Sequence, residues 1–241
     1  MRIFFVRHGQ SDNNALWART QSRQGRLSDP LITELGRRQM GYTAQFLDYC
    51  LTGDLSAGSD PSCSESESGV VYLFCSLMER SVQSALIISE YLHQPLIAHL
   101  DIHENGGIYS HSPDSDEPIG DSGRTRAFFE SQYPQLILPK EMNSRGWWSR
   151  PFEKSEDSSR RAKRALQNIK ENHGASGDTI ILVSHGGFYN YFLSEVLGMK
   201  RPEHVWFELF NAGVTLIDFA DESASILYCN RYSFIPTDLV T

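Results

Sequence analysis

Two short stretches of this chain are purely apolar, which favours strands buried on both faces. "IFFV" (residues 3–6) and "IILV" (residues 180–183) show none of the alternation with polar residues that marks a half-exposed strand. Such strands suit a sheet that helices cover on both sides. The two runs therefore predict a layered α/β fold.

Strand-like and helix-like segments alternate along most of the chain, as expected for this fold class. Helical spacing of apolar residues predicts helices over 33–51, 76–92, 160–174 and 188–198. Thr33 is the expected N-cap of the first and Gly53 its expected end. Further strands are predicted over 2–6, 70–75, 179–183, 204–210, 213–219 and 225–229.

Three polar stretches interrupt the alternation, near residues 53–69, 110–123 and 140–159. The first two are rich in Ser, Asp or Gly and are interpreted as surface insertions. The third contains "RGWW" and is either a flap over a pocket or a long loop pinned by Trp147 and Trp148. No boundary divides the 241 residues, so one domain spanning 1–241 is expected.

Charge and cysteine content limit the partners and the compartment. The formal net charge of -8 argues against nucleic acid or an anionic membrane, but not against a small anionic ligand. The four cysteines are scattered and predict reduced thiols in a cytosolic protein. No run is long enough to span a bilayer. The amino terminus enters a strand and meets Arg7, unlike a signal peptide, so a cytoplasmic location is expected.

Each of the two apolar strands is followed by a histidine and then a glycine. His8 follows the first strand in "VRHGQS", and His185 follows the second in "VSHGGF". Ligands of open α/β sheets bind beyond the carboxyl ends of the strands, where helix N-termini offer free N–H groups. A third strand end is followed by Ser76 and Arg80. The sequence therefore predicts one pocket that contains both imidazoles together with Arg7 and Arg80.

Phosphate is the ligand that this set of residues suits best. Guanidinium groups form bidentate hydrogen bonds to phosphoryl oxygens, and a neutral imidazole is a competent nucleophile toward phosphorus. Neighbouring arginines disfavour the imidazolium and leave a nucleophilic nitrogen free. Glu104, in the loop "DIHENGG", can supply the acid for the leaving oxygen. Each motif is weak alone, but the ordered set is much stronger.

The same residues resemble the ordered signatures of a known family. "VRHGQS" with Asn14, "DPLITELGRRQ", "SLMERSVQSA", "HENGG" and "SHGG" are similar to the histidine phosphatase superfamily, in the branch of the phosphoglycerate mutases. That resemblance implies a three-layer α/β/α sandwich around a mostly parallel mixed sheet, with no metal or cofactor. It implies His8 as the phosphorylated nucleophile and Glu104 as general acid. Arg7, Arg80 and His185 would hold the phosphoryl group, and Asn14 would touch it.

Hydrolysis is the reaction expected here, with two alternatives. The long insertion and basic motifs usual in mutases are not found in this sequence, so water is the simpler second acceptor. Mutase-type transfer back to substrate and a silent phospho-ligand adaptor are the rivals. The expected ligand is a small phosphorylated metabolite or a phosphoprotein, and the substrate and the oligomeric state are not predicted.

Several residues carry weaker hypotheses. Arg19, Arg23 and Arg26 either grip a second anionic group or form a solvated basic loop, with Arg26 the best candidate. Gly186 joins Asn14 and Arg26 as a candidate for substrate binding, because glycine lets a ligand approach the backbone. His99 and His103 are not expected to bind a metal from an extended segment. Ser76 and Ser184 are expected to satisfy backbone groups near the turns.

Overall fold

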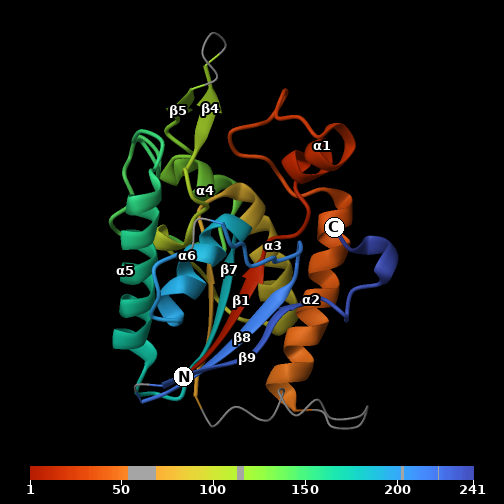
Figure 1. Cartoon of the computed structure of the whole chain (residues 1–241), viewed down its shortest axis with the longest axis vertical. Coiled ribbons are helices and arrows are strands. Elements are labelled where there is room, and N and C mark those ends of the chain that lie inside the picture. The colour runs from red at the N-terminus through yellow and green to blue at the C-terminus, as the bar shows by residue number, and fades with distance from the viewer. Residues whose placement is uncertain (54–68, 113–116, 202–203, 222) are drawn as a thin grey trace.

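The computed structural model describes residues 1–53, 69–112, 117–201, 204–221 and 223–241. A seven-stranded sheet lies between two layers of helices (Figure 1). The helices are α1 (Asp12–Thr20), α2 (Glu34–Thr52), α3 (Glu79–Leu92), α4 (Arg126–Gln132), α5 (Ser155–His173) and α6 (Gly186–Val196). The α/β sandwich expected from the sequence is therefore confirmed.

The sheet is mixed and mostly parallel. Its strand order is β6-β3-β2-β7-β1-β8-β9. The parallel strands are β1 (Arg2–Arg7), β2 (Val71–Cys75), β3 (Leu96–Ala98), β6 (Leu136–Ile137) and β7 (Thr179–Ser184). β8 (Val214–Ala220) and β9 (Ser223–Arg231) are antiparallel to their neighbours. The three strands that carry the predicted site, β2, β7 and β1, are thus neighbours in the middle of the sheet.

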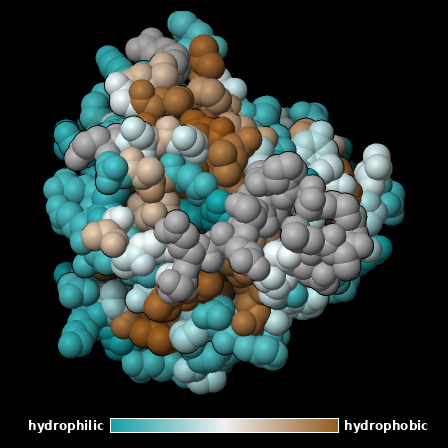
Figure 2. Space-filling view, turned by 90° about the horizontal axis from the view of Figure 1, so that it is seen from below, coloured by the Kyte–Doolittle hydropathy of each residue, from teal (hydrophilic) through white to brown (hydrophobic). Residues whose placement is uncertain are grey.

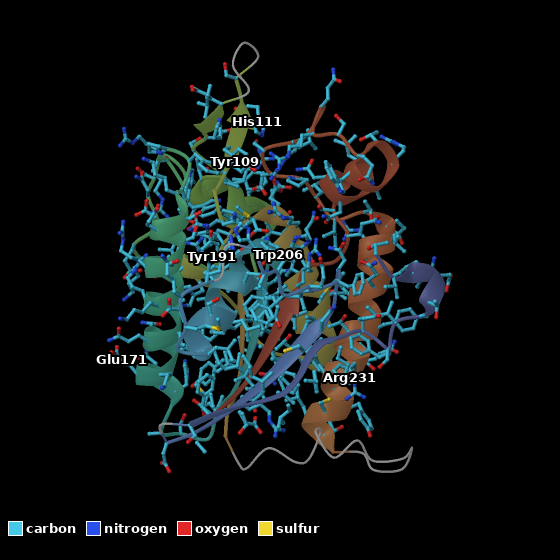
Figure 3. All side chains as sticks on the ribbon, in the orientation of Figure 1. Tyr109, His111, Glu171, Tyr191, Trp206 and Arg231 are labelled. Atoms are coloured by element: carbon cyan, nitrogen blue, oxygen red, sulfur yellow. The ribbon has the colours of Figure 1, made fainter. Side chains whose placement is uncertain are left out.

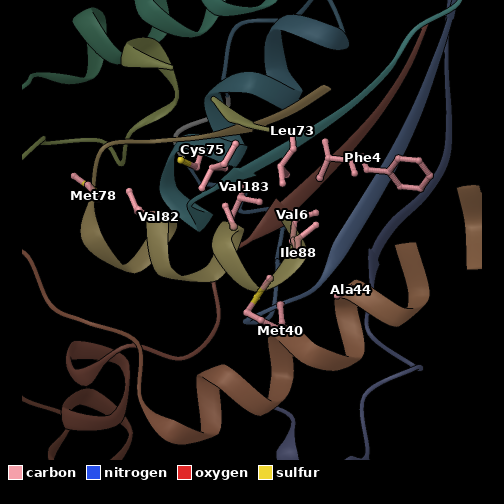
Figure 4. Packing of buried hydrophobic residues seen from close by; sticks show 14 of the residues in the cluster. Phe4, Val6, Met40, Ala44, Leu73, Cys75, Met78, Val82, Ile88 and Val183 are labelled. Atoms are coloured by element: carbon pink, nitrogen blue, oxygen red, sulfur yellow. The ribbon is translucent and has the colours of Figure 1, made fainter. Parts of the chain in front are cut away.

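Each central strand contributes side chains to two separate cores. Phe4 and Val6 of β1 pack with α2 and α3, as Figure 4 shows, in a cluster that includes Met40 and Val82. The intervening residues of β1 and β7 pack on the other face against α5 and α6: Ile3, Phe5, Ile180 and Leu182. This alternation, with no exposed face, explains why both strands read as unbroken apolar runs.

The structure corrects the strand predicted over 204–210. These residues form a turn and extended chain outside the sheet, and they are largely exposed. Their backbone groups bond to side chains instead of to a strand: the Phe207 N–H donates to Asn190, and the Phe210 N–H donates to Asn230. Apolar composition predicted a strand, but side-chain amides satisfy the backbone here.

The polar stretch 110–123 is more ordered than expected. It contains most of a two-stranded hairpin, β4 (Tyr109–His111) and β5 (Pro118–Gly120). The hairpin stands at the end of the molecule where the parallel strands finish (Figure 1). Most of the stretch 53–69 lies outside the described residues.

The third stretch, 140–159, is pinned by its tryptophans. Trp147 and Trp148 are both buried and pack against His103, with ring centroids 5.4 and 4.8 Å from its ring. The segment ends in the first turn of α5. Of the two interpretations, the pinned loop is the one that the structure supports.

Cysteine chemistry departs from the expectation of four reduced thiols. Cys75 and Cys229 are free, but Cys50 is disulfide-bonded.

Within the described ranges, no helix has the length and apolarity required to cross a membrane. The end at which the parallel strands begin is a mixture of hydrophilic surface and separate hydrophobic patches (Figure 2).

A glycine–glycine contact fixes the turn after β1 against α2. A Cβ atom on Gly36 would lie 2.2 Å from the Gln10 carbonyl oxygen, and one on Gly9 would lie 2.4 Å from that of Gly36. The turn after β1 and helix α2 cannot move apart easily, because the Gln10 N–H also donates to the buried side chain of Gln39 in α2 at 2.8 Å. This close approach explains the glycines of both "RHG" and "ELG".

Two alanine substitutions in α2 test this contact. We expect Gly36→Ala to lower the free energy of unfolding by about 1–3 kcal/mol, because the new methyl group overlaps backbone. Gly41→Ala is the matched control: nothing lies within 4 Å of its Cβ position, and alanine there should raise stability by about 0.5–1 kcal/mol. Urea denaturation measures both. Equal effects of the two substitutions would contradict the proposed packing.

Candidate active site

A cavity of about 240 Å³ opens at the carboxyl ends of the central strands. Six of the eight predicted site residues line it: Arg7, His8, Asn14, Arg26, Arg80 and Glu104. The other two, His185 and Gly186, lie directly behind this wall. His185 is fully buried, and a Cβ on Gly186 would lie 3.5 Å from Nε of Arg7. The structure thus brings together residues that the chain separates by up to 179 positions.

The register of the sheet places the two histidines side by side. Arg7 of β1 pairs with Ser184 of β7, so the strands end at the same level and each is followed by its histidine. The two imidazole rings lie 5.1 Å apart between centroids. The His8 N–H donates to the Ser184 carbonyl at 3.0 Å, which holds the first turn to the second strand.

His8 has a defined neutral form. Its Nδ1 lies 2.7 Å from the Gly9 carbonyl oxygen, which can only accept, so Nδ1 carries the hydrogen. Nε2 then keeps its lone pair and accepts from Nε of Arg80 at 3.2 Å. Burial, and then the charges of Arg80 and Arg7, hold the pKa of His8 well below its usual range. The imidazole is therefore neutral near pH 7, with Nε2 as its basic atom.

Ser76 sets the protonation of the second histidine. Its hydroxyl lies 2.7 Å from Nε2 of His185, and it accepts from the Met78 N–H at 3.4 Å. With the oxygen accepting from Met78, the hydroxyl hydrogen is free to donate to Nε2. Burial keeps the pKa of His185 well below its usual range, so the ring is neutral. A Ser76 hydroxyl that donates to Nε2 leaves the ring hydrogen on Nδ1. Ser76 satisfies a backbone N–H near the turn, as expected, and its additional contact with His185 was not predicted from the sequence.

The Glu104 side chain packs against the N-terminal turn of α6. Its carboxylate accepts from the N–H groups of Gly187 at 3.1 Å and Phe188 at 2.8 Å, and from that of Asn105 at 2.9 Å. A helix leaves such N–H groups without intrahelical partners, so the N-terminus attracts the carboxylate. A Cβ on Gly187 would lie 2.3 Å from Oε1 of Glu104, so the second glycine of "SHGG" admits this side chain.

A buried ion pair supports the backbone just before Glu104. Arg161 of α5 is 1% exposed and makes two hydrogen bonds to Glu153, at 2.8 and 2.6 Å. Its Nη1 donates to the carbonyls of Asp101 and His103 at 2.8 Å each. Ser184 donates to the Ile102 carbonyl at 2.7 Å, as expected of a backbone-satisfying serine. These contacts fix the position from which Glu104 reaches the cavity.

The structure gives no support for metal ligation at His103. This side chain is buried, and its Nδ1 lies 2.8 Å from the Glu104 carbonyl oxygen. No group of three His, Cys, Asp or Glu side chains in the described part of the chain is placed to hold a metal ion.

The remaining predicted residues come from α1 and the loop that follows it. Asn14 forms the capping box of α1 with Ser11, and its Oδ1 also accepts from Asn211 at 3.3 Å. Asn211 in turn donates to the His8 carbonyl at 3.1 Å. Arg23 and Arg26 line the cavity, whereas Arg19 is exposed in the last turn of α1 and does not.

Arg80 rests on a cluster of buried charges that the sequence did not predict. Its Nη1 lies 3.7 Å from Oδ1 of Asp29, which also accepts from the Glu79 N–H at 3.1 Å. Glu79 is bound by Nε of Arg124 at 2.6 Å and by the Tyr133 hydroxyl at 3.2 Å. No periodic pattern marks Asp29, Ser76 or Asn211, because each acts through a contact distant in sequence.

The Asp29 carboxyl predicts a measurable dependence of stability on pH. Burial raises its pKa to about 7, although the charge of Arg80 acts to lower it. In the unfolded chain the same group has a pKa of about 4. Between these values the folded state holds a proton that the unfolded state has lost, so this group's contribution to stability falls as pH rises.

Asp29→Asn removes this ionisation. Relative to the variant, the wild type should lose on the order of 2 kcal/mol of unfolding free energy between about pH 5 and pH 8. Urea denaturation of both proteins at the two pH values measures the difference. A wild-type-minus-variant difference that stays constant across the range would show that Asp29 does not titrate there.

Comparison with known proteins identifies relatives of this chain. A curated relative, the "Uncharacterized phosphatase PhoE" of Bacillus subtilis (strain 168), is 24% identical over 222 residues, covering 91% of this chain and 89% of that protein. The phosphoserine phosphatase of Entamoeba histolytica, solved in complex with phosphoserine, superposes with a TM-score of 0.59 at 16% identity, covering 98% of this chain and 99% of that one. The fold is therefore shared at low identity.

Two further solved structures have the same fold. A mycobacterial glucosyl-3-phosphoglycerate phosphatase has a TM-score of 0.59 at 16% identity and covers 95% of this chain and 98% of its own. YhfR of Bacillus stearothermophilus has a TM-score of 0.60 at 17% identity and covers 98% and 99%. The family model described as "Histidine phosphatase superfamily (branch 1)" matches residues 64–231, which include Arg80, Glu104 and His185. Because this match spans well over half of the sequence, the chain belongs to the histidine phosphatase superfamily, branch 1.

Proposed function

We propose that this chain is a phosphomonoesterase that works through a phosphohistidine on His8. The observation that carries the proposal is the lone pair on Nε2 of a buried, neutral His8, held beside Arg80 and at the wall of a cavity that Arg7 and Glu104 also line. The named phosphatases among its relatives support a phosphatase activity.

The first half-reaction transfers the phosphoryl group to the enzyme. The lone pair of Nε2 forms a bond to phosphorus as the bond from phosphorus to the ester oxygen breaks. Glu104, in its protonated form, gives its proton to that oxygen, and the alcohol leaves. Arg80 gives up its hydrogen bond to Nε2 and, with Arg7 and Nδ1–H of His185, binds the equatorial oxygens.

The second half-reaction returns the enzyme to its starting state. The Glu104 carboxylate takes a proton from water as the water oxygen bonds to phosphorus. The phosphorus–nitrogen bond breaks, and its electron pair returns to Nε2 of His8. Positioning and charge stabilisation supply most of the catalysis in such transfers, which suits a site built on rigid strand ends.

The substrate class and the setting are part of the proposal. A small phosphorylated metabolite fits a cavity of about 240 Å³, and two related phosphatases are named for small phosphorylated compounds. Four further expectations stay predictions: a phosphoprotein as the alternative ligand, the absence of nucleic-acid and membrane partners, a single domain, and a cytoplasmic location. Cell fractionation is the direct check of location.

Replacing the proposed nucleophile should abolish turnover. We expect His8→Ala to lower kcat/KM on an aryl phosphate by about a thousandfold or more, since no other neutral imidazole lines the cavity among the described residues. His93→Asn, at an exposed left-handed position ending α3, is the control and should behave as wild type. Acid-labile label from a radioactive substrate should appear on wild type and on His93→Asn, but not on His8→Ala. Turnover by His8→Ala equal to that of wild type would end the proposal.

The role of Glu104 depends on the leaving group. Glu104→Gln keeps the shape of the side chain but has no acidic proton to transfer. We expect kcat/KM to fall about a hundredfold or more for an alkyl phosphate but less than about tenfold for 4-nitrophenyl phosphate, whose leaving group needs no acid. Steady-state kinetics on both esters, with circular dichroism as the folding check, measures this. The same loss on both esters would exclude Glu104 as the general acid.

A further inference from the structure

The outer wall of the cavity carries positive charge that the proposed phosphoryl chemistry does not use. Four arginines line the cavity, and Glu104 is the one carboxylate among the lining residues. Glu104 acts electrostatically on Arg7 and Arg80, and Asp29 acts on Arg80. These carboxylates therefore lie near Arg7 and Arg80, the arginines proposed to bind the phosphoryl group. Arg23 and Arg26, which we call the outer wall of the cavity, have no role in that chemistry.

Neither outer arginine has a carboxylate partner in the part of the chain that the structure describes. Arg23 is exposed at the rim, whereas Arg26 is half-buried and its Nε is shielded from solvent without a hydrogen-bond partner. Burying part of a guanidinium group without a counter-ion is unfavourable. The chain has a net charge of -8, so carboxylates are plentiful. A partly buried cation that none of them neutralises indicates that Arg26 binds the anionic group of a ligand.

The position of Arg26 is fixed in advance of binding. Its guanidinium carbon lies 4.8 Å from the centroid of the Tyr109 ring on β4. Figure 3 shows Tyr109 on the hairpin above the strand ends, at the level of the loop that follows α1. Asn13 holds that loop through two bonds to Leu27, at 2.8 and 3.0 Å. A group held this way loses little conformational freedom when it binds an anion.

Arg26 is also close enough to the reaction centre to act on the same small molecule. Arg26 and Arg80 line the same cavity. Burial, and to a smaller extent the charge of Arg26, lowers the pKa of Arg80, so the two guanidinium groups lie within electrostatic reach of each other. Leu16 and Trp17 of α1 line the same cavity as these two arginines and give it an apolar wall. One short molecule can therefore contact both arginines while its carbon skeleton lies against this wall.

We propose that the substrate is a phosphomonoester with a second anionic group, a carboxylate or a second phosphate, and that Arg26 binds that group. The inference rests on the proposed phosphatase activity and deepens it by assigning the substrate class. Arg23, at the rim, adds attraction for the same charge. The second group selects the substrate through binding, and it takes no part in the chemistry on phosphorus.

Matched substrate pairs test the proposal. 3-Phosphoglycerate and glycerol 3-phosphate differ by a carboxylate against a hydroxymethyl group, and fructose 1,6-bisphosphate and fructose 6-phosphate differ by one phosphate. Wild type should show at least tenfold higher kcat/KM on the doubly anionic member of one pair. The pair that responds tells whether a carboxylate or a phosphate is recognised.

Variants of the outer arginines separate binding from folding. Arg26→Gln should lower kcat/KM on the preferred substrate at least tenfold, mainly through KM, and on its singly anionic partner less than threefold. Arg26→Lys should restore part of the preference, because it restores the charge but not the bidentate geometry. Arg19→Gln removes the same charge from the exposed end of α1 and should change neither substrate.

Two results would overturn this inference and leave the phosphatase proposal standing. One is His8-dependent turnover with equal kcat/KM on both members of both pairs. The other is an Arg26→Gln variant that slows both members of a pair by the same factor, which would give Arg26 a structural role only. If wild type hydrolysed no phosphomonoester at all, including the aryl phosphate, the phosphatase proposal itself would fail and this inference with it.

Discussion

The parallel pairing of β1 with β7 is the constraint on which the rest of the site depends. Because Arg7 pairs with Ser184, the two strands end level and their histidines meet 5.1 Å apart. β2 pairs with β7 on its other side and brings Ser76 to His185. A slip of one residue would turn each strand over and exchange the faces that build the two cores. Core packing and site geometry are therefore set by the same register.

Burial of the site sets the protonation state of its histidines and lowers the stability of the folded protein. Removing His8 and His185 from water keeps both imidazoles neutral, and the proposed nucleophile, His8, needs the neutral ring because only that form has a free lone pair. The same burial places Arg80 near the carboxylates of Asp29 and Glu104, charges that a core of apolar residues would not need. The apolar clusters on both faces of the sheet supply the stability that this polar centre lacks.

Residues whose role follows from their place on a strand or helix could be predicted from the sequence. Apolar runs located β1, β2 and β7, and the ends of these strands with the segments after them located Arg7, His8, Arg80 and His185. Residues that act through distant contacts could not be found this way. Asp29 reaches Arg80 from a loop, and Asn211 reaches His8 from a segment that composition assigned partly to a strand. The hairpin β4–β5 was missed because each of its strands is three residues long, which is too short for a hydrophobic pattern to be recognised.

Recognition and chemistry are carried by different parts of this fold. The atoms proposed to react with phosphorus sit on strand ends and on helix α6, where two cores and the Arg161 ion pair hold them. Arg26 instead lies on the loop after α1, and its guanidinium group stacks on Tyr109 of the β4–β5 hairpin, which belongs to neither core. Changes in that loop and hairpin can alter which anion is bound while the distance between His8 and Glu104 stays the same. Under the proposal for Arg26, the outer wall is therefore the part of this chain that selects its substrate.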